Sequence, residues 1–506
     1  MQLARMKSVA LVGLNTISVD VEVDVGRESE KQNLVIVGLP DSAVKEAKDR
    51  VVAAIRNSEY AVRTLSGTIN LAPGDLKKGG VLYDLPIALG ILKGCGWIET
   101  DHYKDYLIVG ELALSGEMRP INGAFAIALF AKEMGLKGVL LPALNAREAR
   151  AVPQIQIIPI AHLKDAVNFL NHPDSLKAVT CAESFFKVAN PAVDFSDIQG
   201  QAFAKRALEI AAAGGHNVLL WGPPGSGKTM LARSLSGIMP EMTWEESLEA
   251  TRIHSIAGTL SEGEGLLTSR PFRAPHHTVS PAGLIGGGSI PRPGEVSLAH
   301  HGILFLDEMP EFAKKTLEVL RQPLEDRKVT ISRAMGNFTY PTNFICVGAM
   351  NPCPCGLMGH PEKICLDTSL EIKRYRAKIS GPLLDRMDMQ IEVPALRYKD
   401  LMLAAKEEES EAVRERVQKA RKLQFERNGP FKTNGLMTTK DLKLFCQLDD
   451  ESHEIMRYAV DVQGLTARSC HRIMKLTRTI ADLAGSTRLL AEHLLEAIHF
   501  RGFRTA

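Results

Sequence analysis

A glycine-rich loop followed by lysine and threonine is the part of this sequence best suited to chemistry. In NVLLWGPPGSGKTML, a short apolar run precedes the pattern G-x-x-x-x-G-K-[ST], which extends from Gly222 to Thr229. Such a loop lets backbone N–H groups surround phosphate oxygens at a helix N-terminus, where the helix dipole also favours anions. The pattern therefore predicts a strand, a loop and a helix that together hold a nucleoside triphosphate.

Individual side chains of this loop have separate expected roles. The Lys228 ammonium is expected to reach the β- and γ-phosphates, and the Thr229 hydroxyl is expected to bind Mg²⁺. ATP and Mg²⁺ are therefore the expected cofactors. The expected nucleotide-binding residues are Gly222, Pro223, Pro224, Gly225, Ser226, Gly227, Lys228, Thr229 and Met230.

A second motif, GILFLDEMPEF, ends an apolar run with Asp307 and Glu308. An aspartate at the carboxyl end of a buried strand can hold the Mg²⁺ ion, as acidic residues in this type of motif do. Glu308 is then placed to polarise the attacking water. The same pattern also occurs where an ordinary strand leaves a core, so the preceding loop is what favours a catalytic role here.

Four segments in this order resemble a known family. GPPGSGKT, ILFLDEMPEF, GAMNPCPCG and SGPLLDRMD are similar to magnesium-chelatase-like AAA+ ATPases, in particular to the competence-associated ComM (YifB-like) group. The resemblance extends over nearly the whole chain. It implies an ATP-driven motor, a hexameric ring of identical subunits. Such a motor translocates single-stranded or branched DNA and promotes branch migration, as a helicase does, during homologous recombination and natural transformation.

The resemblance also implies roles for three polar residues. Asn351 matches sensor 1, a polar side chain beside the attacking water. Arg386 matches the arginine finger, which stabilises the γ-phosphate of a neighbouring subunit in the transition state, and this requires an oligomer. Arg468 matches the sensor 2 arginine of the lid, and Arg472, one turn along, is the alternative.

Both arginines also have structural alternatives. Arg386 could instead form a salt bridge with Asp385 or Asp388. Arg468 could lie on a solvated helix face.

Two spans without acidic residues, 265–294 and 327–361, carry candidate contacts to a polyanion. The second begins RKVTISRAMGNFTYP, whose alternation predicts a β-hairpin; by resemblance, this hairpin projects into the pore of the ring. Its Phe338 and Tyr340 could stack on bases, but we expect them in the core. A subunit interface or another substrate is the alternative for both spans. The residues expected to contact DNA phosphates are Arg270, Arg273, Arg292, Lys328 and Arg333.

A cysteine cluster lies in NPCPCGLMGHPEKICLD. Cys353, Cys355 and Cys365 together with His360 could form a tetrahedral Zn²⁺ site. The spacing C-x-C-x₄-H-x₄-C departs from the usual C-x₂-C pairs, and relatives commonly have a further cysteine near position 367, where this chain has Asp367. Free cysteines are therefore the preferred interpretation.

The first part of the chain resembles the Lon protease domain, through VGELALSGEMRPINGAFAIALFAKEMG and DLKKGGVLYDLPIALGIL. Leu82 stands at the position of Lon's nucleophilic serine, and Phe125 stands at the position of its lysine. Neither can act as nucleophile or base, so a Ser–Lys peptidase mechanism is absent. A binding or assembly module is expected instead, with Lys78 and Asp84 on its solvated surface.

The pattern of strands, helices and motifs predicts an α/β protein with three parts. Residues 1–185 form a Lon-protease-like α/β domain that lacks the catalytic Ser and Lys. Residues 195–395 form an AAA+ P-loop NTPase αβα core of the magnesium-chelatase type. Residues 396–506 form a C-terminal helical lid. Val188–Asp194, which contains an Asn-Pro pair, is the expected linker between the first two parts.

Composition sets the outer limits. The 506 residues include 61 Lys and Arg against 59 Asp and Glu, so any nucleic-acid contact must come from local patches. No run approaches the roughly 18 apolar residues of a membrane span, and the first residues do not fit a signal peptide. The eight cysteines are scattered apart from one cluster, which is typical of a reducing compartment. A cytoplasmic protein without a membrane partner is expected.

Two other functions remain as alternatives. One is the ATPase subunit of a metal chelatase or another remodelling machine that does not act on DNA; the Lon-like first part argues against the chelatase. The other is a regulatory platform in which nucleotide only controls assembly. The intact set of catalytic candidates argues against the platform; its members are Lys228, Asp307, Glu308, Asn351 and Arg386.

Overall fold

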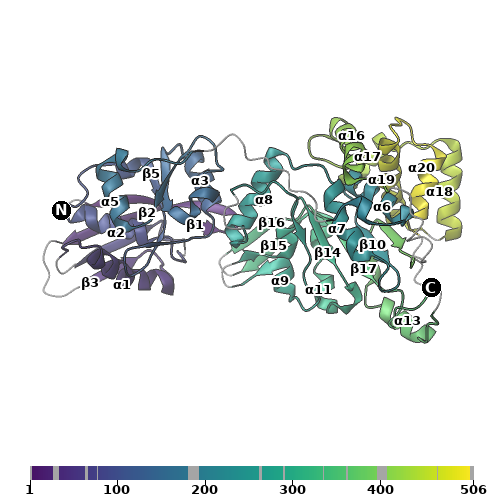
Figure 1. Cartoon of the computed structure of the whole chain (residues 1–506), viewed down its shortest axis with the longest axis horizontal. Helices are drawn as coiled ribbons and strands as arrows, with labels where there is room; N and C mark the ends of the chain where they lie inside the picture. The colour runs from purple at the N-terminus through teal and green to yellow at the C-terminus, as the bar shows by residue number, and fades with distance from the viewer. Residues whose placement is uncertain are drawn as a thin grey trace.

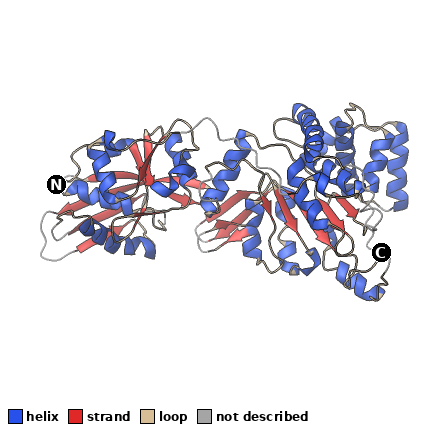
Figure 2. Cartoon of the chain, viewed as in Figure 1, coloured by secondary structure: helices blue, strands red, loops and turns tan. Residues whose placement is uncertain are grey.

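The computed structural model places three groups of elements in a row, with a helical group at one end (Figure 1). Sheet-containing parts form the other end and the middle (Figure 2). The expected linker Val188–Asp194 lies mainly outside the described residues. The structure describes residues 3–26, 33–62, 66–76, 78–180, 193–260, 265–288, 291–333, 336–360, 363–395, 407–463 and 465–501.

The first group is built on a seven-stranded mixed sheet with the order β3-β4-β2-β1-β5-β8-β9. Its strands are β1 Ala4–Val12, β2 Asn15–Gly26, β3 Asn33–Val37, β4 Ser66–Ala72, β5 Tyr106–Ile108, β8 Gly138–Pro142 and β9 Gln156–Ile160. The helices are α1 Ser42–Asn57, α2 Asp84–Gly94, α3 Ala124–Glu133, α4 Ala146–Ala149 and α5 Leu163–Asn171, and β6 Glu111–Leu112 and β7 Met118–Arg119 form a small ribbon. The mixture of strands and helices confirms the predicted α/β class.

Two residues at the positions of a peptidase serine and lysine lie in one apolar cluster. Leu82 and Phe125 are both buried and belong to the same group of packed hydrophobic side chains. Core packing therefore accounts for both residues that the Lon resemblance matches to a catalytic pair.

The prediction that Lys78 and Asp84 lie on a solvated surface is wrong, because both are fully buried. The Lys78 ammonium donates to the carbonyl oxygen of Pro73. Asp84 accepts two hydrogen bonds of 3.0 Å from the Arg50 guanidinium. Burial raises the pKa of the Asp84 carboxyl, and the adjacent guanidinium opposes this shift. These charges are structural because each has a partner inside the domain.

The central group contains a five-stranded sheet with the order β11-β14-β17-β10-β18, in which all pairs are parallel. Its strands are β10 Val218–Trp221, β11 Phe272–Arg273, β14 Ile303–Leu306, β17 Ile345–Met350 and β18 Met389–Glu392. Because the carboxyl ends of parallel strands meet at one edge, the segments after β10, β14 and β17 converge there. These segments carry the glycine-rich loop, the acidic pair and Asn351.

Helices surround this sheet, and two short ribbons extend it. The helices are α6 Ala202–Gly214, α7 Lys228–Ile238, α8 Trp244–Ala257, α9 Pro281–Ile285, α10 Glu295–Leu298, α11 Lys314–Glu318, α12 Arg321–Asp326, α13 Ser369–Arg376 and α14 Gly381–Leu384. The ribbons are β12 Gly286–Gly287 with β13 Arg292–Pro293, and β15 Lys328–Arg333 with β16 Gly336–Pro341. The second ribbon is the hairpin that the alternating pattern predicts, and its Phe338 and Tyr340 are buried as expected.

The third group is helical, as expected. It comprises α16 Ser410–Asn428, α17 Thr439–Phe445, α18 Asp450–Gln463, α19 Ala467–Leu483 and α20 Ala491–His499. Helix α16 packs against α6 and α7, and α19 packs against α6. The lid is therefore anchored on the helices that flank the glycine-rich loop. Within the described part of the chain, no helix is long and apolar enough to cross a membrane.

Among the described residues, the first and central groups touch at α8 and at the β15–β16 hairpin. The Gly123 N–H donates to the Ser255 carbonyl over 3.0 Å, which joins the start of α3 to α8. The Ser255 hydroxyl donates to Glu148 over 2.5 Å. At the second place, the β1–β2 turn packs on the β15–β16 hairpin: a Cβ on Gly13 would lie only 2.9 Å from Phe338 Cδ1. The two sheets are thus connected through α8 and through the hairpin.

Candidate nucleotide-binding site

The glycine-rich loop has a backbone that larger residues would not allow. Gly225 and Gly227 have φ angles of 77° and 91°, in the left-handed region where a side chain is strained. At Gly222, a Cβ would lie 2.0 Å from the carbonyl oxygen of Val393 in the segment after β18. The loop therefore needs glycine for its conformation and for its close approach to a neighbouring segment.

Lys228 begins α7 and folds back over the loop. Its Nζ donates to the carbonyl oxygens of Gly222 and Pro223 over 2.7 and 2.8 Å, and to Asn351 Oδ1 over 3.3 Å. Burial lowers the pKa of this ammonium, and the nearby Asp307 carboxylate opposes the shift. The structure thus brings together Lys228 and Asn351, which sequence reasoning selected separately.

Thr229 and Asp307 also meet. The Thr229 hydroxyl donates to Asp307 Oδ2 over 3.0 Å, and the Glu308 N–H donates to Oδ1 of the same carboxylate over 2.9 Å. Both side-chain oxygens are exposed at the sheet edge beside the loop. Mg²⁺ prefers hard oxygen ligands and is commonly bound through one or two protein oxygens plus phosphates and water. This pair fits that chemistry, and the predicted metal residues are adjacent.

Glu308 and Asn351 face a common cavity of about 460 Å³ next to the loop. Glu308 has a left-handed φ of 49°, which turns the chain directly after Asp307. The cavity is lined by Glu308, Glu311, Asn351, Pro354, Glu371, Arg374, Tyr375 and Lys378. A carboxylate and an amide that share this space can both hydrogen-bond to water there. The water-polarising role of Glu308 and the sensor role of Asn351 stay predictions.

The two candidate arginines from different domains share one acid, Glu325. The Arg386 guanidinium, at 11 % exposure, pairs with one Glu325 oxygen and donates to the Pro382 carbonyl over 2.7 Å. Arg468, at 50 % exposure, donates to the other Glu325 oxygen over 2.7 Å. The salt-bridge alternative for Arg386 thus involves Glu325 and neither Asp385 nor Asp388. Sequence reasoning missed Glu325, and no motif marks it.

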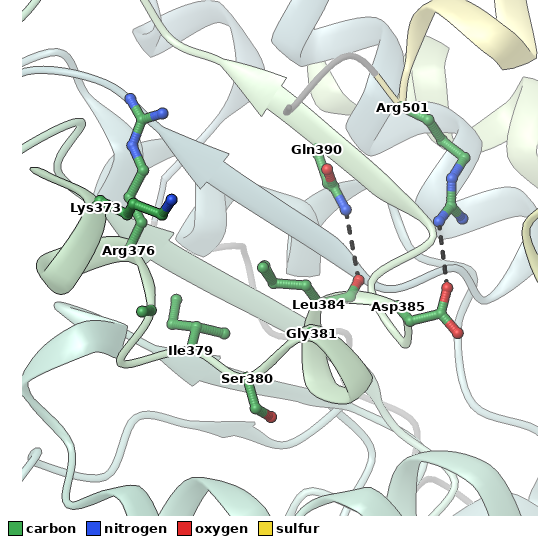
Figure 3. A pocket seen from close by; sticks show the side chains of 10 residues that line it. Lys373, Arg376, Ile379, Ser380, Gly381, Leu384, Asp385, Gln390 and Arg501 are labelled. Carbon is green, nitrogen blue, oxygen red and sulfur yellow. Dashed lines mark hydrogen bonds and ion pairs between the residues drawn. The ribbon is translucent and has the colours of Figure 1, made fainter. Parts of the chain in front are cut away.

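The segment that leads to Arg386 borders a separate cavity of about 500 Å³ (Figure 3). Lys373 and Arg376 lie on one side of it, and on the other side Arg501 forms a 3.7 Å ion pair with Asp385. Gln390 from β18 donates to the Leu384 carbonyl over 3.4 Å. Contacts to both the sheet and the end of the lid therefore hold this segment in place.

Arg472, the alternative for sensor 2, has a different position. Its Nη1 lies 2.6 Å from Asp388 Oδ1. Burial alone would raise the pKa of Asp388, but the Arg472 charge, the nearby His216 ring and the hydrogen bond from the Asn217 N–H hold it far below the usual range. Such a strongly paired arginine stabilises the junction between lid and sheet. Arg468 is the better candidate because half of its side chain is accessible.

The prediction that Arg270 contacts DNA phosphates is wrong. Its side chain is 6 % exposed, pairs with Glu246 over 2.9 Å, and donates to the Pro240 and His301 carbonyls over 2.5 and 2.7 Å. These partners leave it unable to meet a ligand. Arg273 is partly exposed, and two hydrogen bonds to Glu295, of 2.7 and 2.9 Å, neutralise it.

The other three basic candidates, Arg292, Lys328 and Arg333, are exposed on the two short ribbons. The ribbons are in contact, because Arg333 Nε donates to the Gly288 carbonyl over 3.3 Å and the Tyr340 hydroxyl donates to Pro291 over 2.8 Å. Two basic spans separated in sequence thus meet at Arg333, whereas Lys328 lies at the other end of β15. We call Arg292, Lys328 and Arg333 the ribbon cations.

The cysteine cluster is closer than its spacing suggests, but its fourth member differs from the prediction. The sulfurs of Cys353, Cys355 and Cys365 lie 3.4–3.5 Å from one another. A carboxylate oxygen of Asp367 completes the group, with all four atoms within 4.8 Å of one another. Among the residues that the structure describes, His360 is not part of this group.

Comparison with known proteins agrees with these observations. Sequence profiles described as "Magnesium chelatase, subunit ChlI", "Subunit ChlI of Mg-chelatase" and "Magnesium chelatase, subunit ChlI C-terminal" match residues 194–401, 21–145 and 407–501. The chain is 42 % identical to the competence protein ComM of Haemophilus influenzae over 506 residues, which cover 99 % of this chain and 98 % of that protein. It is 39 % identical to YifB of Escherichia coli over 502 residues, 99 % and 97 % of the two chains.

The first domain has a further relative. Over 165 residues, which are 31 % of this chain and 30 % of the other, it is 30 % identical to Lon protease 2 of Bacillus subtilis. This similarity confirms the predicted Lon-like character of the N-terminal part.

The parallel sheet, the phosphate loop after β10 and the acidic pair after β14 define a P-loop ATPase of the AAA+ class. Within this class, the chain belongs to the magnesium-chelatase-like family that includes ComM and YifB. Membership implies hydrolysis of ATP with Mg²⁺ and assembly of several subunits.

Proposed function

We propose that this protein is an ATP-driven ring motor that translocates DNA and promotes branch migration during homologous recombination and natural transformation. The observation that carries the ATP-driven part is the convergence of Lys228, Thr229, Asp307 and Asn351 within hydrogen-bond distance at one sheet edge. Catalysis of phosphoryl transfer depends mainly on such positioning and on charge stabilisation. The proposed organisation is a Lon-like domain over 1–185, an ATPase core over 195–395 and a lid over 396–506.

The proposed catalytic roles follow from these positions. Lys228 binds the β- and γ-phosphates, Thr229 and Asp307 hold Mg²⁺, and Glu308 and Asn351 orient water. Arg386 acts on the nucleotide of a neighbouring subunit, and Arg468 is the sensor 2 arginine of the lid. What supports action in trans for Arg386 is the family to which the chain belongs. Within the chain, Arg386 and Arg468 lie together at Glu325.

The DNA part of the proposal has two supports. The chain is similar over nearly its full length to a protein named for competence, ComM. Arg292, which lies between the two ATP motifs in sequence, and Arg333, which follows the second motif, are also exposed where the two ribbons meet. Lysine and arginine on such a surface bind phosphates without reading sequence. We expect a single-stranded or branched DNA to contact this surface in a hexameric ring.

One experiment tests the DNA part. The rate of ATP hydrolysis is measured with and without a branched DNA, and strand exchange is followed in the same reaction. We expect DNA to stimulate hydrolysis and branch migration to require ATP. The protein could instead hydrolyse ATP at a rate that DNA does not change and leave the branched substrate unchanged. That result would favour a chelatase subunit or another remodelling machine.

A further inference from the structure

Four potential ligand atoms lie together on the segment between β17 and α13. The sulfurs of Cys353, Cys355 and Cys365 are 3.4, 3.5 and 3.5 Å apart. Asp367 Oδ2 lies 3.6 Å from the Cys365 sulfur. These separations are much longer than the ~2.05 Å of a disulfide bond, so three thiols and a carboxylate surround a common point without being joined to one another.

The separations suit one tetrahedral ion. A Zn²⁺ ion has Zn–S bonds of about 2.3 Å and Zn–O bonds of about 2.0–2.2 Å, which place sulfurs about 3.8 Å apart and a sulfur and an oxygen about 3.5 Å apart. The observed distances lie within a few tenths of an ångström of these values. Thiolates with one carboxylate are also a donor set that zinc accepts.

The surroundings are arranged for negatively charged ligands. The Cys355 N–H donates to Asp367 Oδ2 over 2.9 Å, and the Met358 N–H points at the Cys353 sulfur over 3.4 Å. Arg376 of α13 donates to the Pro352 carbonyl over 3.2 Å and contacts the Met358 sulfur over 3.5 Å. Three thiolates and a carboxylate around a dication would leave a net negative charge, which these donors and the guanidinium stabilise.

We propose that Cys353, Cys355, Cys365 and Asp367 bind one structural Zn²⁺ ion that clips the segment after sensor Asn351 to the start of α13. Asp367 fills the place of a fourth cysteine, and His360 takes no part. The His360 Nδ1 instead accepts the Lys363 N–H over 3.1 Å.

The clip bears on the nucleotide site from two directions. Asn351, which contacts Lys228, lies two residues before Cys353. Gly356 follows the first two cysteines and precedes Cys365 and Asp367. It is so close to the phosphate loop that a Cβ there would lie 2.7 Å from Pro224 Cδ. The zinc ion therefore acts as a positioning element for the loop and its sensor and makes no contact with the nucleotide. This inference goes beyond the proposed motor function and does not depend on DNA.

The test uses inductively coupled plasma mass spectrometry to measure the metal content of the full-length protein, purified without chelators. We expect about one zinc per chain in the unmodified protein and less than about one fifth of that in Cys365→Ser and Asp367→Ala. Asp367→Cys should restore about one zinc, because a thiolate replaces the carboxylate in the same tetrahedron. His360→Ala is the matched control and should retain the metal.

A second measurement shows whether the variants fold and whether the ion is structural. Circular dichroism should show near-unmodified helix content for Cys365→Ser, since Cys365 lies on the partly exposed segment, while its thermal transition moves to lower temperature. The assignment would be overturned if the unmodified protein folded without zinc or held a different metal at full stoichiometry. Loss of zinc in His360→Ala would also overturn it. Full zinc retention by Cys365→Ser would overturn it as well.

Discussion

At Glu325, two arginines from different domains bind one carboxylate. Arg386 precedes β18 in the central domain, and Arg468 lies in α19 of the lid. A guanidinium that must reach a phosphate gains from being held near its working position, because misplacement by about 1 Å can cost about 100-fold in rate. We therefore expect Glu325 to position both guanidinium groups for their proposed roles.

Glu325→Ala should lower the rate of ATP hydrolysis by about 10- to 100-fold because both arginines lose their common partner. Nucleotide affinity should change little, since Lys228 and the loop are untouched. Steady-state kinetics together with a fluorescent-nucleotide titration separate the two effects. The neighbouring exposed Asp326→Ala is the control, and equal rates for Glu325→Ala and this control would contradict the role.

Two substitutions in the nucleotide site should separate ATP binding from ATP hydrolysis. Lys228→Ala removes the ammonium at the phosphates and should abolish ATP binding. Glu308→Gln keeps the shape but loses the carboxylate that polarises water, so it should bind ATP and fail to turn it over. Equilibrium binding and phosphate release measure both steps. Normal phosphate release by Glu308→Gln would remove this residue from the mechanism.

At the scale of elements, the two short ribbons bring Arg292 and Arg333 close together because one ribbon contacts the other. Each alone is small, and the hairpin β15–β16 is held by its buried Phe338 and Tyr340. Their exposed faces carry the ribbon cations. A cation on an anchored ribbon keeps its place, so the surface has a fixed geometry toward a strand of phosphates.

Replacing Arg292 and Arg333 by Gln should reduce the salt dependence of DNA affinity. Each lost contact should lower the slope of log affinity against log salt by about 0.9 for duplex or about 0.7 for single-stranded DNA. Fluorescence anisotropy over a salt series measures this. Arg273→Gln is the matched control, because that arginine is already neutralised by Glu295. An unchanged slope in the double variant would mean that the surface faces another partner.

The sequence could predict those parts of the fold and the site that are formed by residues close together in the chain. The phosphate loop needs its glycines within eight residues, and the hairpin follows from alternation, so both were found. Contacts between distant segments gave no such signal. The acid-free span around Arg270 is not acid-free in space, because Glu246 of α8 reaches it. Asp367 meets the cysteines only after the segment folds, which spacing alone did not indicate.

At the scale of the whole molecule, each chain supplies only part of the proposed active site. The loop, the metal-binding residues and the water-orienting residues converge at one sheet edge, whereas Arg386 and Arg468 gather at Glu325. An arginine supplied by a neighbour is worth about 10³–10⁵ in rate. The proposed ring is therefore a condition for turnover.

Mixing two inactive variants tests this condition. Lys228→Ala retains the finger but lacks the binding lysine, and Arg386→Ala has the reverse defect. In equal mixture with random assembly, about one quarter of the interfaces combine both intact parts, so about one quarter of the unmodified ATPase rate should return. Lys228→Ala mixed with the double variant should stay inactive. No recovery, or full-rate hydrolysis by a monomer in saturating nucleotide, would contradict action in trans.

The packing of the β15–β16 hairpin against the β1–β2 turn has a mechanical consequence. Gly13 leaves no room for a side chain against Phe338, and α8 is bonded to the first domain at Gly123. An ATP-driven movement of the β15–β16 hairpin would therefore be transmitted to the β1–β2 strand pair. The first domain would therefore either move with the hairpin or restrain it.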